Sequence, residues 1–223
     1  MERPANRSYK LRGTRITAAQ ESATDQFWSE FGISVDGVEH PAPIIPAEIF
    51  PDSQQVIMEI GTGMGEATAE IARTFPDVGF LAVELHRPGI GALLARIAEM
   101  KLQNIRIIND DARVVLENLI PDQSISAFHL YFPDPWPKKK HWKRRIVQAD
   151  FVELISRKLQ PGGYIHIATD WVPYAQWIVN LFEKSDSFSG GAIEKPEFRP
   201  TTKFEGQGLR KGHEVTDLKY FKS

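Results

Sequence analysis

Five short apolar runs recur along the chain and predict the strands of a buried sheet. They cover residues 56–60, 80–83, 105–108, 125–132 and 164–168. Within each run, apolar residues follow one another more often than they alternate with polar ones. That pattern is typical of parallel strands that are covered on both faces.

Helical periodicity occupies segments between and after these runs. Apolar residues recur at helix spacing over 90–98, 147–155 and 174–182, and Pro88 stands where a helix would begin. Strands that alternate with helices of this length predict an α/β fold with a parallel sheet. Because such sheets bind ligands beyond the carboxyl ends of their strands, the residues after each strand are the candidates for chemistry.

The composition fits one globular domain. The chain has 223 residues, of which 42% are hydrophobic and 25% charged, so wholesale disorder is excluded. It contains no cysteine, which excludes disulfides, thiolate metal sites and a cysteine nucleophile. The apolar runs are too short to span a membrane and no signal peptide is evident, so we expect a cytoplasmic protein. Residues 1–45 are basic and then rich in proline, and we expect an N-terminal extension there and a single domain over 46–223.

Two short basic segments stand out against an acidic chain. Residues 138–145 carry six Lys or Arg and no acid, and residues 3–15 carry five. These segments hold 11 of the 27 cations, which leaves 16 cations against 29 acids elsewhere. Concentrated basic patches favour a polyanionic partner, although a solvated helix face is an equally ordinary source of a charge run.

A glycine-rich turn follows the first predicted strand. Gly61, Gly63 and Gly65 form a G-x-G-x-G sequence, which permits a tight turn and lets a ligand approach the backbone. The dinucleotide fingerprint needs a further glycine at position 66, where this chain has Glu66. Because Glu59 and Glu66 would repel a pyrophosphate, the turn is closer to an S-adenosylmethionine loop, whose ligand carries no phosphate.

Acidic residues follow the next two predicted strands. Glu84 stands where a carboxylate can accept hydrogen bonds from both hydroxyls of a ribose, and the alternative is a helix-capping acid. Asp111 suits either a hydrogen bond from an adenine amino group or the cap of the helix that follows.

The segment after the fourth predicted strand reads FPDPWPKKKHWKRR (132–145). Its three prolines fix a rigid, extended loop that holds Asp134 beside Trp136. A carboxylate beside an aromatic face suits an extruded purine, which would stack on the ring and donate hydrogen bonds to the carboxylate. The basic run would then contact phosphates. The alternative is a proline-rich turn around a core tryptophan.

Asp170 follows the fifth predicted strand and adds a second carboxylate at the same edge. The alternative is that Thr169 or Asp170 caps the next helix, and the two roles are compatible. Residues 198–215 are rich in glycine and charge and are predicted to form a functional loop. The six histidines show no metal-ligand spacing. His129 and His166 lie within predicted strands, where core or hydrogen-bonding roles are expected.

Together these motifs resemble the tRNA (guanine-N7)-methyltransferase family of the single-chain bacterial type. The resemblance runs from about residue 7 to residue 221 and rests on MEIGTGMGE, VELHRPGIG, FPDPWPKKKHWKRR, ATDWVPYA and RPTTKFE. FPDPWPKK with the basic run after it is the most specific motif. The chain departs from the family pattern at Thr62, Gln207 and Thr216, which concerns local packing rather than the reaction.

The resemblance implies a class I, Rossmann-like methyltransferase fold: a mostly parallel seven-stranded sheet with helices on both faces. It implies S-adenosylmethionine as methyl donor, no metal, and N7 of the variable-loop guanosine of tRNA (position 46) as acceptor. It implies tRNA as the partner, with no membrane and no obligatory protein partner. The protein is then expected to be a monomer or a homodimer. By motif, the donor-binding positions are Glu59, Gly61, Gly63, Gly65, Glu84, Asp111 and Asp134, and Asp134 also matches the catalytic residue. The substrate-binding positions are Lys138, Lys140, His141, Trp142, Lys143, Arg144, Arg145, Asp170, Thr202, Lys203, Phe204 and Glu205.

Three other functions stay open at this point. The chain could methylate another RNA or a non-RNA acceptor, although the basic run argues against a non-RNA acceptor. It could use NAD, against which the missing glycine argues. It could be a non-catalytic RNA-binding protein, against which the acids Glu59, Glu84 and Asp134 argue.

Overall fold

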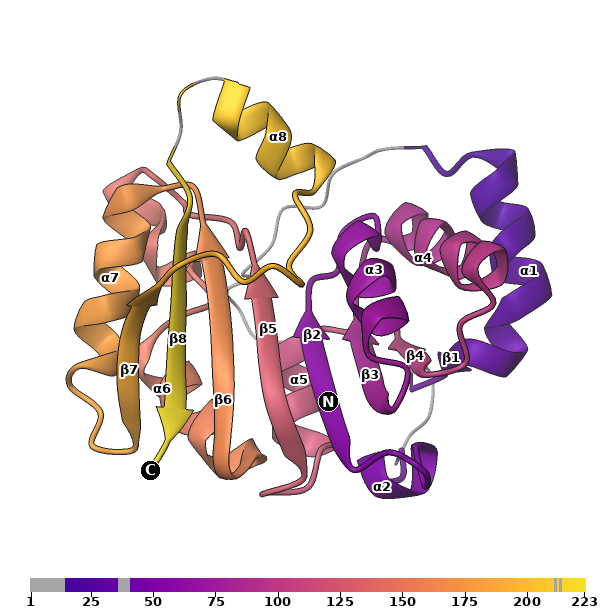
Figure 1. Ribbon diagram of the computed structural model, residues 1–223, viewed down its shortest axis with the longest axis horizontal. Coiled ribbons are helices and arrows are strands. Elements are labelled where there is room, and N and C mark those ends of the chain that lie inside the picture. Colours follow the sequence, from indigo (N-terminus) through magenta and orange to yellow (C-terminus); the bar gives the residue numbers. More distant parts are fainter. Residues whose placement is uncertain (1–14, 36–40, 211, 213) are drawn as a thin grey trace.

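The computed structural model describes residues 15–35, 41–210, 212 and 214–223, so most of the predicted basic segment at 3–15 lies outside the described residues. Among these described residues, eight strands form one sheet in the order β1-β4-β3-β2-β5-β6-β8-β7 (Figure 1). The strands are β1 (Gly32–Ile33), β2 (Gln55–Ile60), β3 (Val78–Val83), β4 (Ile105–Ile108), β5 (Ile125–Tyr131), β6 (Leu159–Thr169), β7 (Phe188–Ile193) and β8 (Thr216–Lys222).

The five strands predicted from apolar runs are confirmed as β2 to β6, and they pair with one another in parallel. In the described part of the chain the sheet has eight strands rather than the expected seven, because the two-residue β1 adds to the edge beside β4. At the other side β8 runs antiparallel to both β6 and β7.

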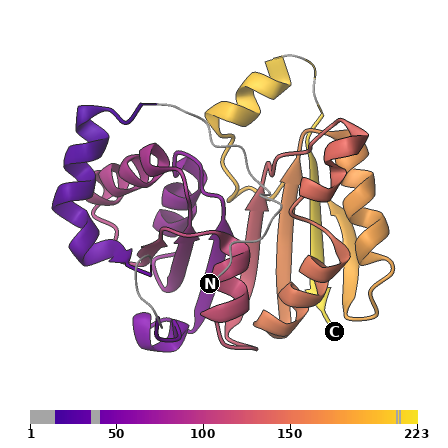
Figure 2. The ribbon, with the colours of Figure 1, turned by 180° about the vertical axis from the view of Figure 1, so that it is seen from behind.

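Helices cover both faces of the sheet, as predicted (Figures 1 and 2). Helices α3 and α4 lie on one face, with α1 packed outside α4, and α5, α6 and α7 lie on the other. The helices are α1 (Ala18–Phe31), α2 (Pro46–Ile49), α3 (Glu66–Thr74), α4 (Arg87–Met100), α5 (Ala112–Asn118), α6 (Ala149–Lys158), α7 (Val172–Phe182) and α8 (Lys203–Arg210), with a 3-10 helix η1 (Lys139–Arg144).

Helix α1 lies within the segment expected to be an N-terminal extension. Thr17 and Gln20 form a reciprocal capping box at its start, and Ala23 and Phe31 are buried. Gly91 of α4 lets the two helices approach closely, because an added Cβ there would collide with the backbone of Gln20. The described part of this segment is therefore packed against the sheet's own helices.

The strand order indicates where on the sheet a ligand would bind. From β2 the chain proceeds outward through β3 and β4, and it then returns to β5 on the other side of β2. The carboxyl ends of β2 and β5 therefore flank a topological switch point, where open α/β sheets bind their ligands. Helix α8 lies above this carboxyl edge, over β5 and β6 (Figure 1). It falls within residues 198–215, which the sequence predicted to be a loop, so that prediction is wrong for 203–210.

Candidate active site

The glycine turn after β2 has the backbone that its sequence predicts. Gly61, Gly63 and Gly65 have φ of 74°, 58° and 72°, a left-handed region that strongly favours glycine. Gly65 caps α3, where an added Cβ would lie 2.7 Å from the Cβ of Leu93. Gly89 of α4 packs onto the same turn, because a Cβ there would collide with the carbonyl of Gly63. The turn is thus held from outside by the first residues of α4.

Glu59 is a buried carboxylic acid directly before this turn. It is 2% exposed, and its Oε2 has no hydrogen-bond partner among the described residues. Burial raises the pKa of Glu59 from its ordinary 4.5 to about 8, because the ionised carboxylate loses its hydration. A cationic ligand group beside Glu59 would stabilise the ionised form, so this residue fits a positively charged ligand such as S-adenosylmethionine.

Glu84, at the end of β3, organises the glycine turn. Its Oε2 accepts a hydrogen bond from the Gly63 amide at 2.7 Å, and its Oε1 accepts from the amides of Leu85 and His86, each at 2.8 Å. All three amides lie before the helices, since α4 begins at Arg87, so these bonds hold the turn and are not the helix cap that was the alternative. Ribose binding by the remaining acceptor capacity of Glu84 stays a prediction.

Asp111, after β4, is the N-cap of α5. Its Oδ1 accepts a hydrogen bond from the Arg113 amide at 2.9 Å. The capping alternative is confirmed for this residue, and a contact with adenine stays a prediction.

The proline-rich loop after β5 is held in a strained conformation. Phe132 and Trp136 have φ of 51° and 44°, and for residues with a Cβ the left-handed region costs about 1–2 kcal/mol each. Two hydrogen bonds offset this strain: the Phe132 amide donates to the Ala168 carbonyl at 2.7 Å, and Nε of Arg145 donates to the Pro135 carbonyl at 2.9 Å. The half-buried Asp134 therefore has a fixed place between them.

Trp136 does not offer an open face for a base. Its side chain is 6% exposed, and the Arg144 guanidinium carbon lies 3.8 Å from its ring centroid. The expectation that a purine stacks on Trp136 is contradicted, because the ring is buried and one face is covered. The core-tryptophan alternative is the one that this structure supports.

The basic run divides into exposed and buried members. Lys138, Lys139, Lys140 and Lys143 are exposed on or beside η1, whereas His141, Trp142 and Arg144 are half-buried. These exposed ammonium groups, on a helix that follows the Asp134 loop directly, are available to phosphates.

Arg145 is an exception to the expectation for this run. It is 3% exposed, and its guanidinium carbon lies 4.8 to 5.0 Å from the ring centroids of Trp142, Tyr174 and Trp177. Burial lowers the pKa of Arg145. A guanidinium that is buried among three aromatic rings does not fit the expected RNA contact.

Asp170 follows β6 at the same edge as Asp134. Tyr131 and Ala168 are paired in register at the ends of β5 and β6, so both half-buried aspartates stand two or three residues beyond one pair. Helix α7 begins after Trp171, whose own side chain makes no capping hydrogen bond. Oγ1 of Thr169 accepts from the Trp171 amide at 3.3 Å, directly before the helix, and a capping role for Asp170 stays a prediction.

The predicted substrate-binding segment 202–205 forms the start of α8. Oγ1 of Thr202 accepts a hydrogen bond from the Glu205 amide at 3.2 Å, and Lys203 and Phe204 contribute backbone to the first turn. Glu205 is 2% exposed and its carboxylate is bound by Arg199 and Lys195. This burial does not fit a direct substrate contact by Glu205.

Sequence reasoning missed the residues that bind Glu205. Arg199 is buried between Glu205 and Asp217 of β8, and Asp217 is bonded to His166 of β6. A signal was present: Asp217 is an acid within an otherwise strand-like run, and Arg199 opens the RPTTKFE motif. Because the segment is rich in glycine and charge, the sequence predicted a functional loop there.

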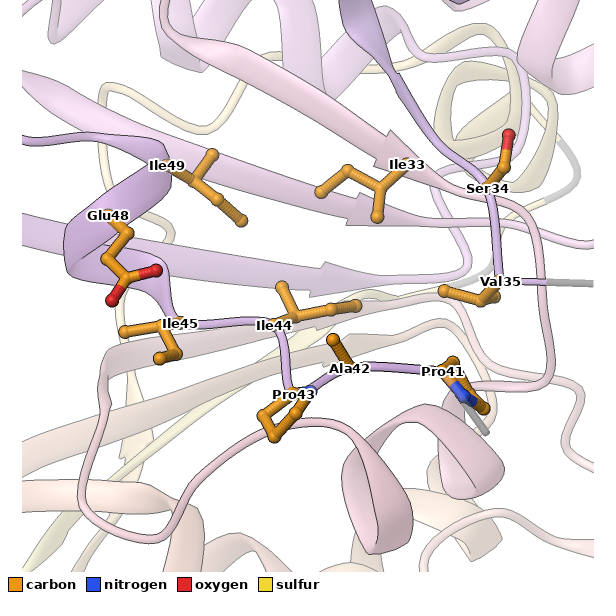
Figure 3. Close-up of a pocket in the computed structure, with 10 residues that line it drawn as sticks. All are labelled: Ile33, Ser34, Val35, Pro41, Ala42, Pro43, Ile44, Ile45, Glu48 and Ile49. Atoms are coloured by element: carbon orange, nitrogen blue, oxygen red, sulfur yellow. The ribbon is translucent and has the colours of Figure 1, made fainter. Parts of the chain in front are cut away.

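A separate pocket of about 320 Å³ lies between β1 and α2 (Figure 3). Apolar side chains such as Ile33, Ile44 and Ile49 line it, with the Glu48 carboxylate at its side. None of the predicted site residues lines this pocket. Among the described residues, no group of three or more His, Asp or Glu could hold a metal ion, and no helix is long and apolar enough to cross a membrane.

Solved structures with the same fold include RNA methyltransferases. A 16S rRNA methyltransferase, KamB, has a TM-score of 0.59 at 15% identity, over 79% of this chain and 91% of that chain. An rRNA methylase from Streptococcus thermophilus has a TM-score of 0.53 at 14% identity, over 80% and 92% of the two chains. A Streptococcus mutans protein solved in complex with SAH has a TM-score of 0.53 at 11% identity, over 80% and 94%. At these identities the likeness confirms the methyltransferase fold alone.

Relatives in sequence show the family to which the chain belongs. The family described as "Putative methyltransferase" matches residues 53–218. The tRNA (guanine-N(7)-)-methyltransferase of Neisseria meningitidis serogroup A is 46% identical over 218 residues, which are 95% of this chain and 89% of that protein. The protein of the same name from Nitrosomonas europaea is 44% identical, over 96% of this chain and 96% of its own length. That from Streptomyces avermitilis is 44% identical, over 95% of this chain and 73% of its own length. The chain therefore belongs to the tRNA (guanine-N7)-methyltransferase family, whose methyl donor is S-adenosylmethionine.

Proposed function

We propose that this protein transfers a methyl group from S-adenosylmethionine to N7 of a guanosine in tRNA, and that this guanosine is the one at position 46 of the variable loop. The observation that carries the proposal is a juxtaposition at the β2/β5 switch point. A turn suited to a cationic nucleoside follows β2, and a rigid carboxylate loop that continues into an exposed basic helix follows β5. Membership of the tRNA (guanine-N7)-methyltransferase family supports guanine as the base and N7 as the methylated atom.

On the donor side, three groups serve distinct purposes. Glu59 supplies a carboxylate for the positively charged part of the donor, Gly61 and Gly63 leave room above the turn, and Glu84 offers acceptors for the ribose. A Cβ built on Gly61 or Gly63 would meet nothing within 4 Å, so space for a ligand lies directly over the backbone. The bound donor supplies an activated methyl group on a positively charged sulfur.

On the acceptor side, the base needs orientation more than activation. Guanine N7 has a free lone pair at neutral pH, so no general base has to remove a proton before attack. As the N7–carbon bond forms and the sulfur–carbon bond breaks, the electron pair goes to sulfur and the guanine ring becomes cationic. Asp134 and Asp170 are the carboxylates that would stabilise this charge and accept from the N1 and N2 hydrogens of guanine. Adenine lacks those donors, so the same contacts would discriminate against it.

The exposed lysines of η1 would hold the tRNA backbone. Lys140 and Lys143 stand a few residues after Asp134, so phosphates bound there would place the target nucleotide over the β5 end. The substrate would place the enzyme in the cytoplasm.

The test is methyl transfer from labelled S-adenosylmethionine to unmodified tRNA, followed by borohydride–aniline cleavage to map 7-methylguanosine. Label at the variable-loop guanosine supports the proposal in full. Label at another guanosine N7 would refute the position, and label on another atom or acceptor would refute the reaction. A tRNA with adenosine at position 46 is the matched control and should accept no label there.

A further inference from the structure

A buried polar network ties α8 to the sheet. Arg199 Nη1 donates to Glu205 Oε2 at 2.8 Å, and its Nη2 donates to Glu205 Oε1 at 3.1 Å. The same guanidinium donates to both carboxylate oxygens of Asp217, at 2.7 Å from Nε and 2.8 Å from Nη2. Arg199 is therefore a two-sided bridge between α8 and β8.

The network extends into the sheet beyond this bridge. His166 Nε2 lies 2.7 Å from Asp217 Oδ1, and His166 Nδ1 lies 3.1 Å from the hydroxyl of Tyr131. These groups come from the neighbouring strands β5, β6 and β8. The position of Asp217 is thus fixed by the sheet itself, from two sides.

Every member of this bridge is withdrawn from solvent. Arg199, Glu205 and Asp217 are 2 to 3% exposed. Hydrogen bonds to the two carboxylates outweigh the desolvation of Arg199 and raise its pKa, and Asp217 is held below its usual pKa against its own burial. Because a buried charge without its partner is strongly unfavourable, the three side chains hold one another in a single arrangement.

The bridge holds a short helix that lies at one end of the sheet. Helix α8 has eight residues, including two glycines, and it lies over the carboxyl edge rather than against a face of the sheet (Figure 1). The segment between β7 and α8 crosses in front of β8 and β6 and contains Arg199 (Figure 1). Lys195 strengthens the attachment, since its Nζ lies 2.6 Å from Thr201 Oγ1 and 3.1 Å from Glu205 Oε1.

We propose that Arg199 is a positioning residue for methyl transfer: by bridging Glu205 and Asp217 it holds the first turn of α8, with Thr202, over the carboxyl ends of β5 and β6. Glu205 then acts as the anchor of this turn and makes no contact with the substrate. The expected effect on methyl transfer rests on the proposed function, because α8 would form one wall of the guanosine site. The anchoring of α8 by Arg199 does not depend on any reaction.

The test compares Arg199→Lys, Glu205→Gln and the double variant with wild type. A lysine keeps the charge but cannot bridge two carboxylates in the same geometry. Glu197→Gln is the matched control, because Glu197 is an exposed acid of the same segment outside the bridge. Each protein is measured for hydrogen exchange of the α8 amides, for binding of S-adenosylmethionine by calorimetry, and for kcat and KM with unmodified tRNA.

We expect exchange in α8 to accelerate at least tenfold in both single variants and to stay unchanged in the control. S-adenosylmethionine affinity should stay within twofold, which shows that the donor side is intact. The kcat/KM for tRNA should fall about tenfold or more in each single variant, and the double variant should be no worse than the poorer single one. That non-additivity is the signature of one shared bridge.

Other results would overturn the inference. If α8 exchange were unchanged in Arg199→Lys, the bridge would not anchor the helix, whatever the substrate. If Glu205→Gln lost activity while Arg199→Lys did not, Glu205 would be a substrate ligand. If donor affinity fell together with kcat/KM for tRNA, Arg199 would contribute only to general stability. Where Arg199→Lys fails to fold, the measurement is repeated with Asp217→Asn, which leaves Arg199 and Glu205 in place. Absence of guanosine N7 methylation by wild type would refute the proposed function and leave the exchange result standing.

Discussion

Replacement of Glu59 by Gln should make the ligand-free protein more stable, and the gain should depend on pH. Gln has the size and shape of Glu but no charge. Below pH 4.5 the carboxyl is protonated in both the folded and the unfolded chain, so its ionisation contributes nothing to the difference. Between pH 4.5 and about 8 the unfolded chain releases the proton while the folded chain retains it. The native state then binds more protons, so stability falls as pH rises.

The size of the effect follows from the raised pKa. A rise from 4.5 to about 8 corresponds to at most about 5 kcal/mol lost above pH 8, because each pKa unit is worth about 1.36 kcal/mol. The Gln variant lacks this loss. The free energy of unfolding of Glu59→Gln should therefore rise relative to that of wild type by several kcal/mol between pH 5 and pH 9. The contributions of all other titrating groups are the same in both proteins and cancel in the comparison.

The assay is urea unfolding of both proteins, without ligand, at several values of pH from 5 to 9. Glu99→Gln, which removes an exposed acid of α4, is the control and should follow wild type at every pH. Unfolding free energies of wild type and Glu59→Gln that stay parallel across this range would refute the reasoning, because the carboxyl would then ionise at its ordinary pKa despite its burial.

Three further predictions concern the opposite side of the site. Asp134→Ala should lower single-turnover methylation of tRNA by about 100-fold or more, as measured with labelled donor, while donor affinity falls less; near-normal turnover would remove Asp134 from the reaction. Lys140→Ala and Lys143→Ala should each reduce the slope of log affinity for tRNA against log salt by about 1, and an unchanged slope would place that lysine outside the interface. Arg145→Met should cost about 2 kcal/mol in urea unfolding, because the Pro135 carbonyl loses its donor, and should leave the salt slope unchanged; a reduced slope would restore Arg145 to the RNA-contacting stretch.

The sequence predicts the central sheet well because strand signals there are local. Residues 105–108 form β4 with the predicted bounds, and Pro88 lies in the first turn of α4 as its position suggests. The glycine turn is also predictable, since three glycines directly after an apolar run indicate a tight turn whose backbone enters the left-handed region. These features depend on residues that are close together in the chain.

The misread residues depend on distant neighbours. Arg145 has the same composition around it as Arg144, and it is enclosed in part by Tyr174 and Trp177 of α7, about 30 residues further on. Helix α8 has glycines and charges that favour a loop, and Arg199 and Asp217 anchor it through contacts that no local pattern contains. The burial of Trp136 is likewise a property of how the loop folds back.

The position of β8 between β6 and β7 bears on how the chain acquires its structure during synthesis. Strand β7 is made before β8, yet its paired neighbour in the described sheet is β8, so β7 has no place to add until the later strand emerges. The donor-side strands β2, β3 and β4 and their helices are complete long before this step. Such an order is slow by nature, because the last pairing joins segments far apart in sequence. Asp217 belongs to that last strand, and a nascent chain would therefore form β2, β3 and β4 first and gain the contact between Arg199 and Asp217 only when β8 joins the sheet.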